Sequence, residues 1–233
     1  MTYEDLCVAT KAAQPFTRDG WIFELKYDGF RILASCHSGS ATLLSRKGTN
    51  FTAQFPELAT ELADLPDIVL DCELVMLDPD GVPQFEPLVR RSRLKRDISI
   101  EHAARTRPAV LYAFDLLELK GKDMRELPLI KRKKSLQKAI APAKRILPVG
   151  HFERDGVTLF RLAAEKGIEG IVAKRADSPY RAGRSFDWIK IKTAAGRAID
   201  EQRAIWNERP VSEAGEIRRR AKSGRFGRRR GRR

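Results

Sequence analysis

The chain has 233 residues, of which 42% are hydrophobic, and it carries a formal net charge of +14 at pH 7. This composition excludes a wholly disordered chain and leaves room for one large domain or two small ones with a buried core. The basic balance favours a polyanionic partner, with nucleic acid as the first candidate, although a folded domain with a basic tail would carry the same charge.

Much of the charge lies near the C-terminus, where residues 194–233 hold 12 arginines and one lysine against five acidic residues. Three cysteines, Cys7, Cys36 and Cys72, are far apart and indicate neither a metal site nor a disulfide framework. No apolar segment has the length of a signal peptide or of a membrane span. We therefore expect a soluble protein of the reducing cytoplasm, without a membrane partner.

The first half of the chain favours strands over helices. Residues 21–35, WIFELKYDGFRILAS, predict a strand with a turn or bulge at Asp28-Gly29, and residues 41–45 predict a second short strand. Apolar residues at 55, 58, 62 and 65 recur at helical spacing and predict an amphipathic helix. Residues 67–77 predict a strand that ends at the turn signal DPDG.

The second half mixes both types. Residues 110–117, VLYAFDLL, predict a buried strand, and residues 129–140 predict a surface helix with its lysines and arginines on the outer side. A helix over 159–166, strands over 168–174 and 188–192 and a helix over 198–206 follow, whereas the Arg/Gly-rich residues 216–233 are expected to be disordered. Because helices are interspersed rather than paired with each strand, the pattern favours an α+β fold.

Lys26 is unusual because its neighbours predict a buried strand, and lysine is seldom buried without a partner. One interpretation is a lysine at a strand end that extends its amine to solvent. The other is a nucleophile, whose pKa of about 10.4 would have to be lowered by burial and by nearby cations. The residue alone does not decide between them.

Six motifs follow one another along the chain: KYDGFR at 26–31, SRKG at 45–48, DCEL at 71–74, YAFD at 112–115, EGIVAK at 169–174 and WIKIK at 188–192. In that order they resemble the nucleotidyltransferase motifs of the covalent ligase and mRNA-capping superfamily. Together with FTAQFPEL at 51–58 and the whole of 169–188, they resemble ATP-dependent DNA ligases of the bacterial ligase D type. The resemblance covers residues 15–193.

This resemblance implies an ATP-grasp-like nucleotidyltransferase domain, with two antiparallel sheets flanked by helices, over residues 1–193. Residues 194–233 would form a short helix and a basic tail. Ligases of this type continue into an OB-fold domain, but the residues after 192 are too few and too polar for its five strands, so we expect that domain to be absent. Residues 218–233 are either a tether for DNA or a solubilising tail.

The resemblance also implies residue roles, with Lys26 as the catalytic nucleophile that attacks the α-phosphate of ATP and keeps AMP. The implied nucleotide-binding residues are Glu24, Arg31, Arg46, Glu73, Phe114, Lys174, Lys190 and Lys192. Within this set Phe114 would stack on the adenine, and the four cations at 31, 46, 190 and 192 would meet phosphates. Glu73 and Glu169 would bind Mg²⁺ or Mn²⁺. The alternatives are a solvated basic face, a core phenylalanine and strand-end salt bridges.

The predicted function is that of a monomeric ATP-dependent DNA ligase that seals nicks during repair or recombination, in the cytoplasm with the nucleoid. Its predicted partners are nicked or broken double-stranded DNA and either a DNA end-binding protein or a separate repair protein that carries an OB domain. Two alternatives remain open: an RNA ligase or capping guanylyltransferase, and a truncated ligase that binds DNA without sealing it.

Overall fold

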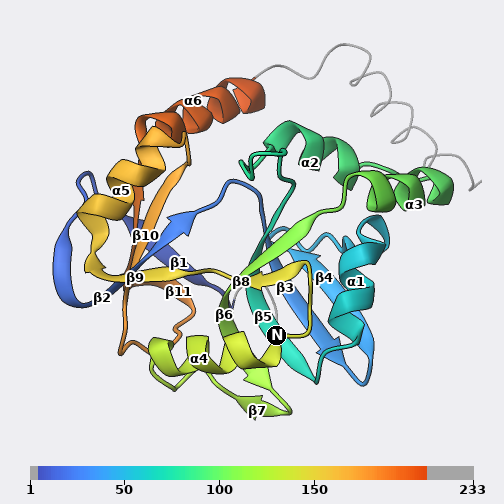
Figure 1. Cartoon of the computed structure of the whole chain (residues 1–233), viewed down its shortest axis with the longest axis horizontal. Helices are drawn as coiled ribbons and strands as arrows, with labels where there is room; N and C mark the ends of the chain where they lie inside the picture. Colours follow the sequence, from blue (N-terminus) through green and yellow to red (C-terminus); the bar gives the residue numbers. More distant parts are fainter. Residues whose placement is uncertain (1–4, 209–233) are drawn as a thin grey trace, which may run out of the picture. The chain divides into compact units, whose positions relative to one another are not determined.

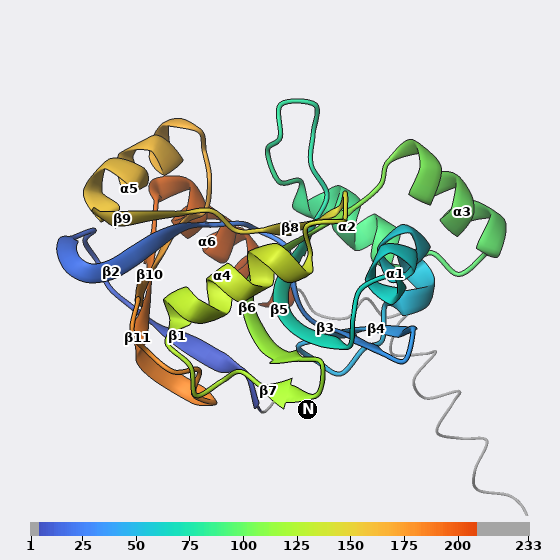
Figure 2. The ribbon, with the colours of Figure 1, turned by 60° about the horizontal axis from the view of Figure 1, so that its bottom comes forward.

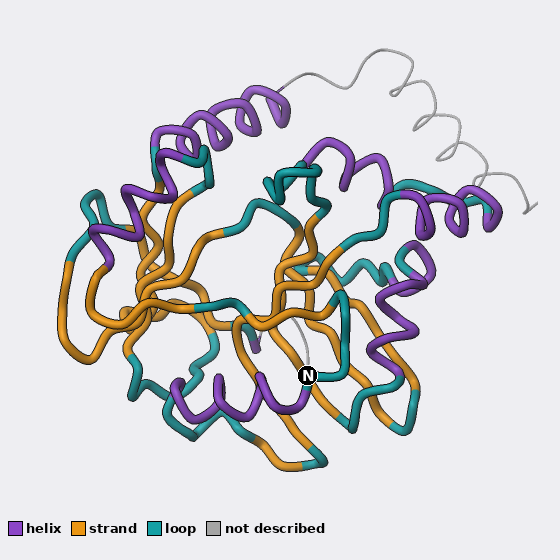
Figure 3. The backbone as a smooth tube through the Cα atoms, viewed as in Figure 1, coloured by secondary structure: helices purple, strands orange, loops and turns teal. Residues whose placement is uncertain are grey.

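The computed structural model describes residues 5–208, which form an α+β fold with two sheets and flanking helices (Figure 1). Figure 3 shows the strands in two groups, with helices around them. The expected fold class is therefore confirmed. Within the described residues, no helix is long and apolar enough to cross a membrane.

The first sheet has five strands in the order β1-β11-β10-β2-β9. Their bounds are Cys7–Lys11 for β1, Thr17–Lys26 for β2, His151–Asp155 for β9, Gly170–Arg175 for β10 and Gly183–Lys192 for β11. Neighbours are antiparallel except for the parallel pair β1–β11. Helix α5, Gly156–Glu165, covers one face of this sheet, where Phe23, Leu159 and Ile171 are buried together.

The second sheet has the order β4-β3-β5-β6-β7, and β8 pairs with β6 in parallel. The strands are β3 Phe30–His37, β4 Ser40–Ser45, β5 Ile68–Val75, β6 Val110–Leu119, β7 Lys122–Asp123 and β8 Ile146–Pro148. Its helices are α1 Pro56–Ala63, preceded by a 3₁₀ turn at Thr52–Gln54, α2 Phe85–Ser92, α3 Asp97–Thr106 and α4 Leu129–Ala139. Leu58 and Leu62 of α1 and Leu136 of α4 lie in the apolar core against this sheet.

The two sheets meet around a smaller apolar cluster that includes Leu33, Tyr180 and Trp188, with Phe114 packed against it. The chain passes between the sheets directly after Lys26, the last residue of β2, because β3 belongs to the second sheet. Gly29 makes this crossing possible, since a Cβ at that position would lie 2.2 Å from the Leu74 carbonyl oxygen. The strand predicted over 21–35 is therefore two strands in different sheets.

Helix α4 differs from its prediction in one respect. Lys131, Lys134 and Lys138 are exposed, as expected, but Arg132 and Lys133 are buried, with 0% and 6% of their surface exposed. The expectation that all cations of this helix face outward is wrong. The reason is that two buried carboxylates, which lie on other elements, attract the two inward side chains.

After β11 the described residues form one helix, α6, Ala194–Glu208, which includes the helix predicted over 198–206. Backbone contacts separate residues up to Arg197 from those after it, so the predicted domain boundary at 193/194 stays a prediction. Residues 209–233 lie outside the described part of the chain, and with them the predictions of disorder and DNA tethering for the basic tail.

Candidate active site

Lys26 lies at the end of β2 with its side chain 24% exposed. Its amine is 2.6 Å from Oε2 of Glu169, the residue that immediately precedes β10, and Lys26 and Gly170 are Cα partners in the β2–β10 ladder. Lys192 contacts the other oxygen of the same carboxylate at 2.5 Å. One buried glutamate therefore holds two lysines, which lie at the ends of the interior strands β2 and β11 of the first sheet. The nearest charge to the Lys26 amine is therefore a carboxylate, whereas the sequence analysis considered only nearby cations.

Further cations lie beside Lys26 and Lys192. Lys190 is on β11, two residues before Lys192, and no carboxylate of the described residues is within 4 Å of its amine. Burial lowers the pKa of Lys190, and the charges of Lys26, Lys11, Lys192 and Arg46 lower it further. Arg46 follows β4 of the second sheet, so the two sheets contribute to the same positive field. Lys26, Arg46 and Lys192 thus lie near Lys190, whereas contact of Arg31, Arg46, Lys190 and Lys192 with phosphates stays a prediction.

Glu73, on β5, is the half-buried carboxylate that faces these cations from the second sheet. Arg31 is its Cα partner on β3. Burial raises the pKa of Glu73 to about 7; Lys26 and Arg31 lower it, whereas Glu169 and Asp28 raise it. A carboxyl with this pKa is only about half ionised at neutral pH, so a cation that arrives beside it would complete its ionisation.

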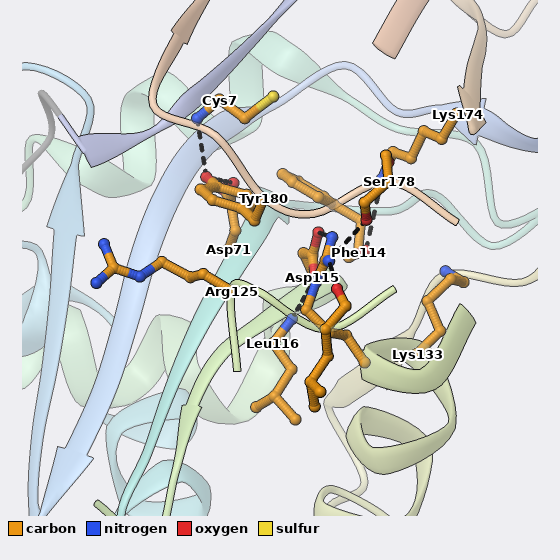
Figure 4. Close-up of polar contacts among 12 residues, drawn as sticks. Cys7, Asp71, Phe114, Asp115, Leu116, Arg125, Lys133, Lys174, Ser178 and Tyr180 are labelled. Atoms are coloured by element: carbon orange, nitrogen blue, oxygen red, sulfur yellow. Dashed lines mark hydrogen bonds and ion pairs between the residues drawn. The ribbon is translucent and has the colours of Figure 1, made fainter. Parts of the chain in front are cut away.

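Arg31 is held rigidly by Asp71, which is fully buried on β5. Its Nε and Nη2 donate to Oδ1 and Oδ2 of Asp71 at 2.9 and 2.6 Å. The Tyr180 hydroxyl donates to the same carboxylate at 2.6 Å and accepts from the Cys7 backbone N–H at 3.0 Å (Figure 4). Burial would lower the pKa of Arg31, but Asp71 raises it well above its usual value. Arg31 is thus a permanent cation in a fixed orientation.

Phe114, on β6, lies between the sheets with cations over its ring. The Lys174 amine is 4.6 Å and the Arg31 guanidinium 5.6 Å from the ring centroid, and Trp188 packs edge-on at 6.0 Å. The Lys174 amine also lies 3.9 Å from the Trp188 ring. This aromatic pair, which is half-buried at Phe114 and buried at Trp188, is the apolar part of the site. Whether Phe114 stacks on a base stays a prediction.

Glu24, on β2, is 2% exposed and binds two ammonium groups, Lys174 at 2.6 Å and Lys133 at 2.5 Å. Burial opposes ionisation of this carboxyl, but the two lysines lower the pKa of Glu24 below its ordinary value. Burial in turn lowers the pKa of Lys174, while Glu24 raises it. Glu24 and Lys174, which the sequence assigns separately, form one buried charge cluster.

The sequence reasoning missed three groups that shape the site: Asp71, Tyr180 and Lys133. Asp71 had a usable signal, since it is a second acid two residues before Glu73 in an apolar strand. Tyr180 and Lys133 had none, because their partners are 109 residues away along the chain. Only tertiary contacts place them.

The carboxylates suit a divalent cation that is held largely by phosphate and water. Among residues 5–208, no group of three or more His, Cys, Asp or Glu could hold a metal ion with protein ligands alone. Mg²⁺ usually takes one or two carboxylates and keeps its remaining sites for water and phosphate oxygens. Glu73 fits this pattern. Glu169 would fit only if Lys26 or Lys192 released one of its oxygens.

Comparisons with known proteins find similar proteins over most of the chain. Residues 5–192 match the family model described as ATP dependent DNA ligase domain. The chain is 37% identical over 198 residues to the bifunctional non-homologous end joining protein LigD of Bacillus subtilis, which covers 74% of this chain and 31% of the relative. It is 32% identical to the SPbeta prophage-derived DNA ligase-like protein LigB of the same organism, over 76% of this chain and 63% of the relative.

A solved structure described as mycobacterial DNA ligase D complexed with ATP and MES superposes with a TM-score of 0.65 at 32% identity. The match covers 81% of this chain and 60% of that one. The ligase domain of LigD from M. tuberculosis gives a TM-score of 0.66, also at 32% identity, over 82% of this chain and 62% of that one. The chain spans about a third of the length of the Bacillus subtilis LigD that it matches.

Proposed function

Because the chain belongs to the ATP-dependent DNA ligase domain family, we propose that it catalyses the nucleotidyl-transfer chemistry of DNA ligation, with Lys26 as the residue that becomes linked to AMP. The observation that carries the proposal is the position of Lys26. Its side chain is 24% exposed, and it lies near Lys190 and Lys192 of the first sheet and Arg46 of the second.

In the first step the neutral Lys26 amine attacks the α-phosphorus of ATP. A phosphorus–nitrogen bond forms, the bond from the α-phosphorus to the bridging oxygen breaks, and pyrophosphate leaves with the electron pair. Lys26 loses two protons in all: its ammonium gives one to Glu169 Oε2, its partner at 2.6 Å, before the attack, and the second passes from the nitrogen to water as the phosphoramidate forms. Phosphoryl transfer depends mainly on positioning and on neutralisation of charge.

Charge neutralisation falls to the cations of the site. Lys190 has no carboxylate partner among the described residues, so its amine can bind the triphosphate directly. Lys192 shares Glu169 with Lys26, so it can bind the triphosphate once its contact with Glu169 breaks. Arg31, oriented by Asp71, and Arg46 supply positive charge from the second sheet. Phe114 and Trp188 offer the apolar surface for the base, beside the Glu24–Lys174 pair.

Glu73, together with Glu169 if one ammonium withdraws, would hold a divalent cation, for which we propose Mg²⁺ or Mn²⁺. When bound, the ion supplies additional positive charge to the phosphate oxygens. Its approach would also favour the ionised form of Glu73, whose pKa is raised to about 7.

The later steps act on DNA. AMP passes from Lys26 to the 5′-phosphate of a nick, and the 3′-hydroxyl then displaces AMP and forms the phosphodiester bond. We propose nicked or broken double-stranded DNA as the substrate, since the relatives are named for end joining. The same proposal assigns residues 1–193 to the adenylation domain, the basic tail to DNA contact and the chain to the cytoplasm.

The test uses purified full-length chain, Mg²⁺ and labelled ATP or GTP, followed by peptide mass spectrometry. The expected result is a covalent AMP on Lys26 with ATP, no adduct with GTP, and no adduct for Lys26→Arg, which keeps the charge but is a poor nucleophile. An adduct with GTP alone would indicate a guanylyltransferase. An adduct on another residue, or none, would contradict the proposal.

Transfer to nucleic acid is then followed with nicked duplexes of DNA and of RNA. Release of AMP from Lys26 with a sealed DNA strand supports the ligase. Release with RNA only would indicate an RNA ligase, and a stable adduct that neither substrate discharges would indicate a non-sealing protein.

A further inference from the structure

Helix α4 joins the two sheets through two adjacent residues, Arg132 and Lys133. Arg132 pairs with Asp115 of β6, in the second sheet, through Nε at 2.7 Å and Nη2 at 2.8 Å. Lys133 pairs with Glu24 of β2, in the first sheet, at 2.5 Å and also donates to the Val149 carbonyl oxygen at 2.9 Å. Neighbouring positions on one helix therefore bind carboxylates that belong to different sheets.

The helix itself is firmly fixed. The Leu129 and Ile130 backbone N–H groups donate to the carbonyl oxygens of Ser178 and Ala176, in the segment between β10 and β11. Arg132 also donates to the Ser178 carbonyl oxygen at 3.0 Å. In Figure 2, α4 crosses in front of the region where the two sheets approach each other, and Figure 4 shows Lys133 rising from α4 and Lys174 extending from β10.

We propose that Lys133 is a positioning residue for nucleotide binding, which acts through Glu24 and Lys174. The inference rests on the proposed function, and it adds a residue that lies outside the six motifs. Lys133 occupies one oxygen of Glu24, so that the other oxygen faces Lys174. Lys174 is thereby held against the faces of Phe114 and Trp188, where its amine borders the predicted place of the base.

The physical reason is conformational. A lysine amine has three donors on a flexible four-carbon stem, and an isolated Lys174–Glu24 pair could adopt several geometries. A second ammonium on the opposite oxygen fixes the carboxylate plane, and the Val149 carbonyl and the helix fix that ammonium. The base would then meet a preorganised donor rather than one that must be ordered at the time of binding.

The positioning role of Lys133 can be tested by substitution because the buried cluster has one more positive than negative charge. Glu24 is one carboxylate between two ammonium groups, so Lys133→Met removes a charge and leaves Glu24 and Lys174 as a balanced pair. A buried charge without a partner, which is the costly outcome of breaking a buried ion pair, does not arise. The methionine fills a similar volume, so we expect this variant to fold.

The experiment measures the rate of Lys26–AMP formation against ATP concentration for the full-length chain, for Lys133→Met and for Lys134→Met. Lys134 is the neighbouring exposed lysine, and its variant changes net charge by the same amount. Lys133→Met is expected to raise the half-saturating ATP concentration about tenfold, as loss of one charge-assisted hydrogen bond would. The maximal rate should stay within about threefold of wild type, because Lys133 does not touch the reacting phosphate. Lys134→Met should match wild type in both.

A Lys133→Met variant with an unchanged half-saturating concentration would overturn the inference, and so would an equal fall in maximal rate and affinity, which indicates general damage. If circular dichroism shows that Lys133→Met does not fold, Lys133→Gln replaces it, because glutamine keeps a donor for Glu24. This variant is expected to show a smaller rise in the half-saturating ATP concentration. No rise would again overturn the inference. A wild-type chain that forms no Lys26–AMP defeats the proposed function instead.

Discussion

Two sets of ion pairs, each centred on one carboxylate, lie at different depths in the molecule, and we expect only the shallower one to take part in the reaction. Glu169 holds Lys26 and Lys192 at the ends of β2 and β11, where the two lysine side chains are 24% and 15% exposed. Asp115 holds Arg132 where both side chains are 0% exposed. An ATP phosphate could replace the first carboxylate as a partner, whereas nothing can reach the second. The depth of an ion pair, rather than its length, indicates which one can exchange partners.

The largest expected effect comes from breaking the deep pair. Arg132→Met leaves the Asp115 carboxylate buried without a cation and should lower the free energy of unfolding by about 3–5 kcal/mol. Urea unfolding followed by circular dichroism measures it. The double variant Asp115→Asn/Arg132→Met removes both charges and should recover at least half of the loss. A change below about 1 kcal/mol for the single variant would show that the depth of the pair has no structural consequence.

The next largest effect tests the shallow cluster. Lys192→Met should reduce the rate of Lys26–AMP formation about 100- to 1,000-fold, because one preorganised contact to developing phosphate charge is removed. Its free energy of unfolding should change by less than about 1 kcal/mol, because the buried Glu169 carboxylate keeps Lys26 as its cation and no unpaired buried charge arises. Lys138→Met on the outer face of α4 is the matched control and should retain full activity. Equal losses in both variants would show that the loss reflects net charge rather than the contact of Lys192 with Glu169.

A smaller effect depends on pH and on Glu73. The folded carboxyl has a pKa of about 7 against an ordinary 4.5, so between these values it keeps a proton that the unfolded chain has lost. Glu73 therefore lowers stability progressively as pH rises from about 4.5 to 7, by roughly 3 kcal/mol in total. Glu73→Gln should remove this loss. Urea unfolding of both proteins at pH 5 and pH 7.5 measures the difference, and parallel pH profiles would contradict the prediction.

The smallest effect concerns the tail, whose residues lie outside the described part of the chain. Deletion of residues 209–233 should leave Lys26–AMP formation within about twofold, because the predicted tether contacts DNA phosphates rather than ATP. Binding of nicked DNA should become weaker and less dependent on salt. Affinity measured across a salt series gives the slope, and an unchanged slope would favour the solubilising role.

Much of the fold followed from local pattern. The strands β5, β6 and β10 and the helices α1, α4 and α5 lie within a few residues of their predicted positions, because runs of β-branched residues and apolar spacing report which face is buried. Strands β1, β8 and β9 and helices α2 and α3 were not predicted. These strands are short or polar, and their ladders exist only because distant partners lie beside them, as Cys7 of β1 lies beside Gly183 of β11.

For the candidate site, the sequence by itself determined the chemical groups: a lysine that can act as a nucleophile, cations for phosphates and carboxylates for a metal, in an order that resembles one enzyme family. Only the tertiary structure decided how these groups pair. Glu169 binds Lys26 and Lys192, Asp71 binds Arg31, and Lys133 of α4 reaches Glu24 across 109 residues of chain. The spacing of apolar residues indicates which face of one helix or strand is buried. An ion pair depends instead on the distance between two elements, and only their packing in the folded chain sets that distance.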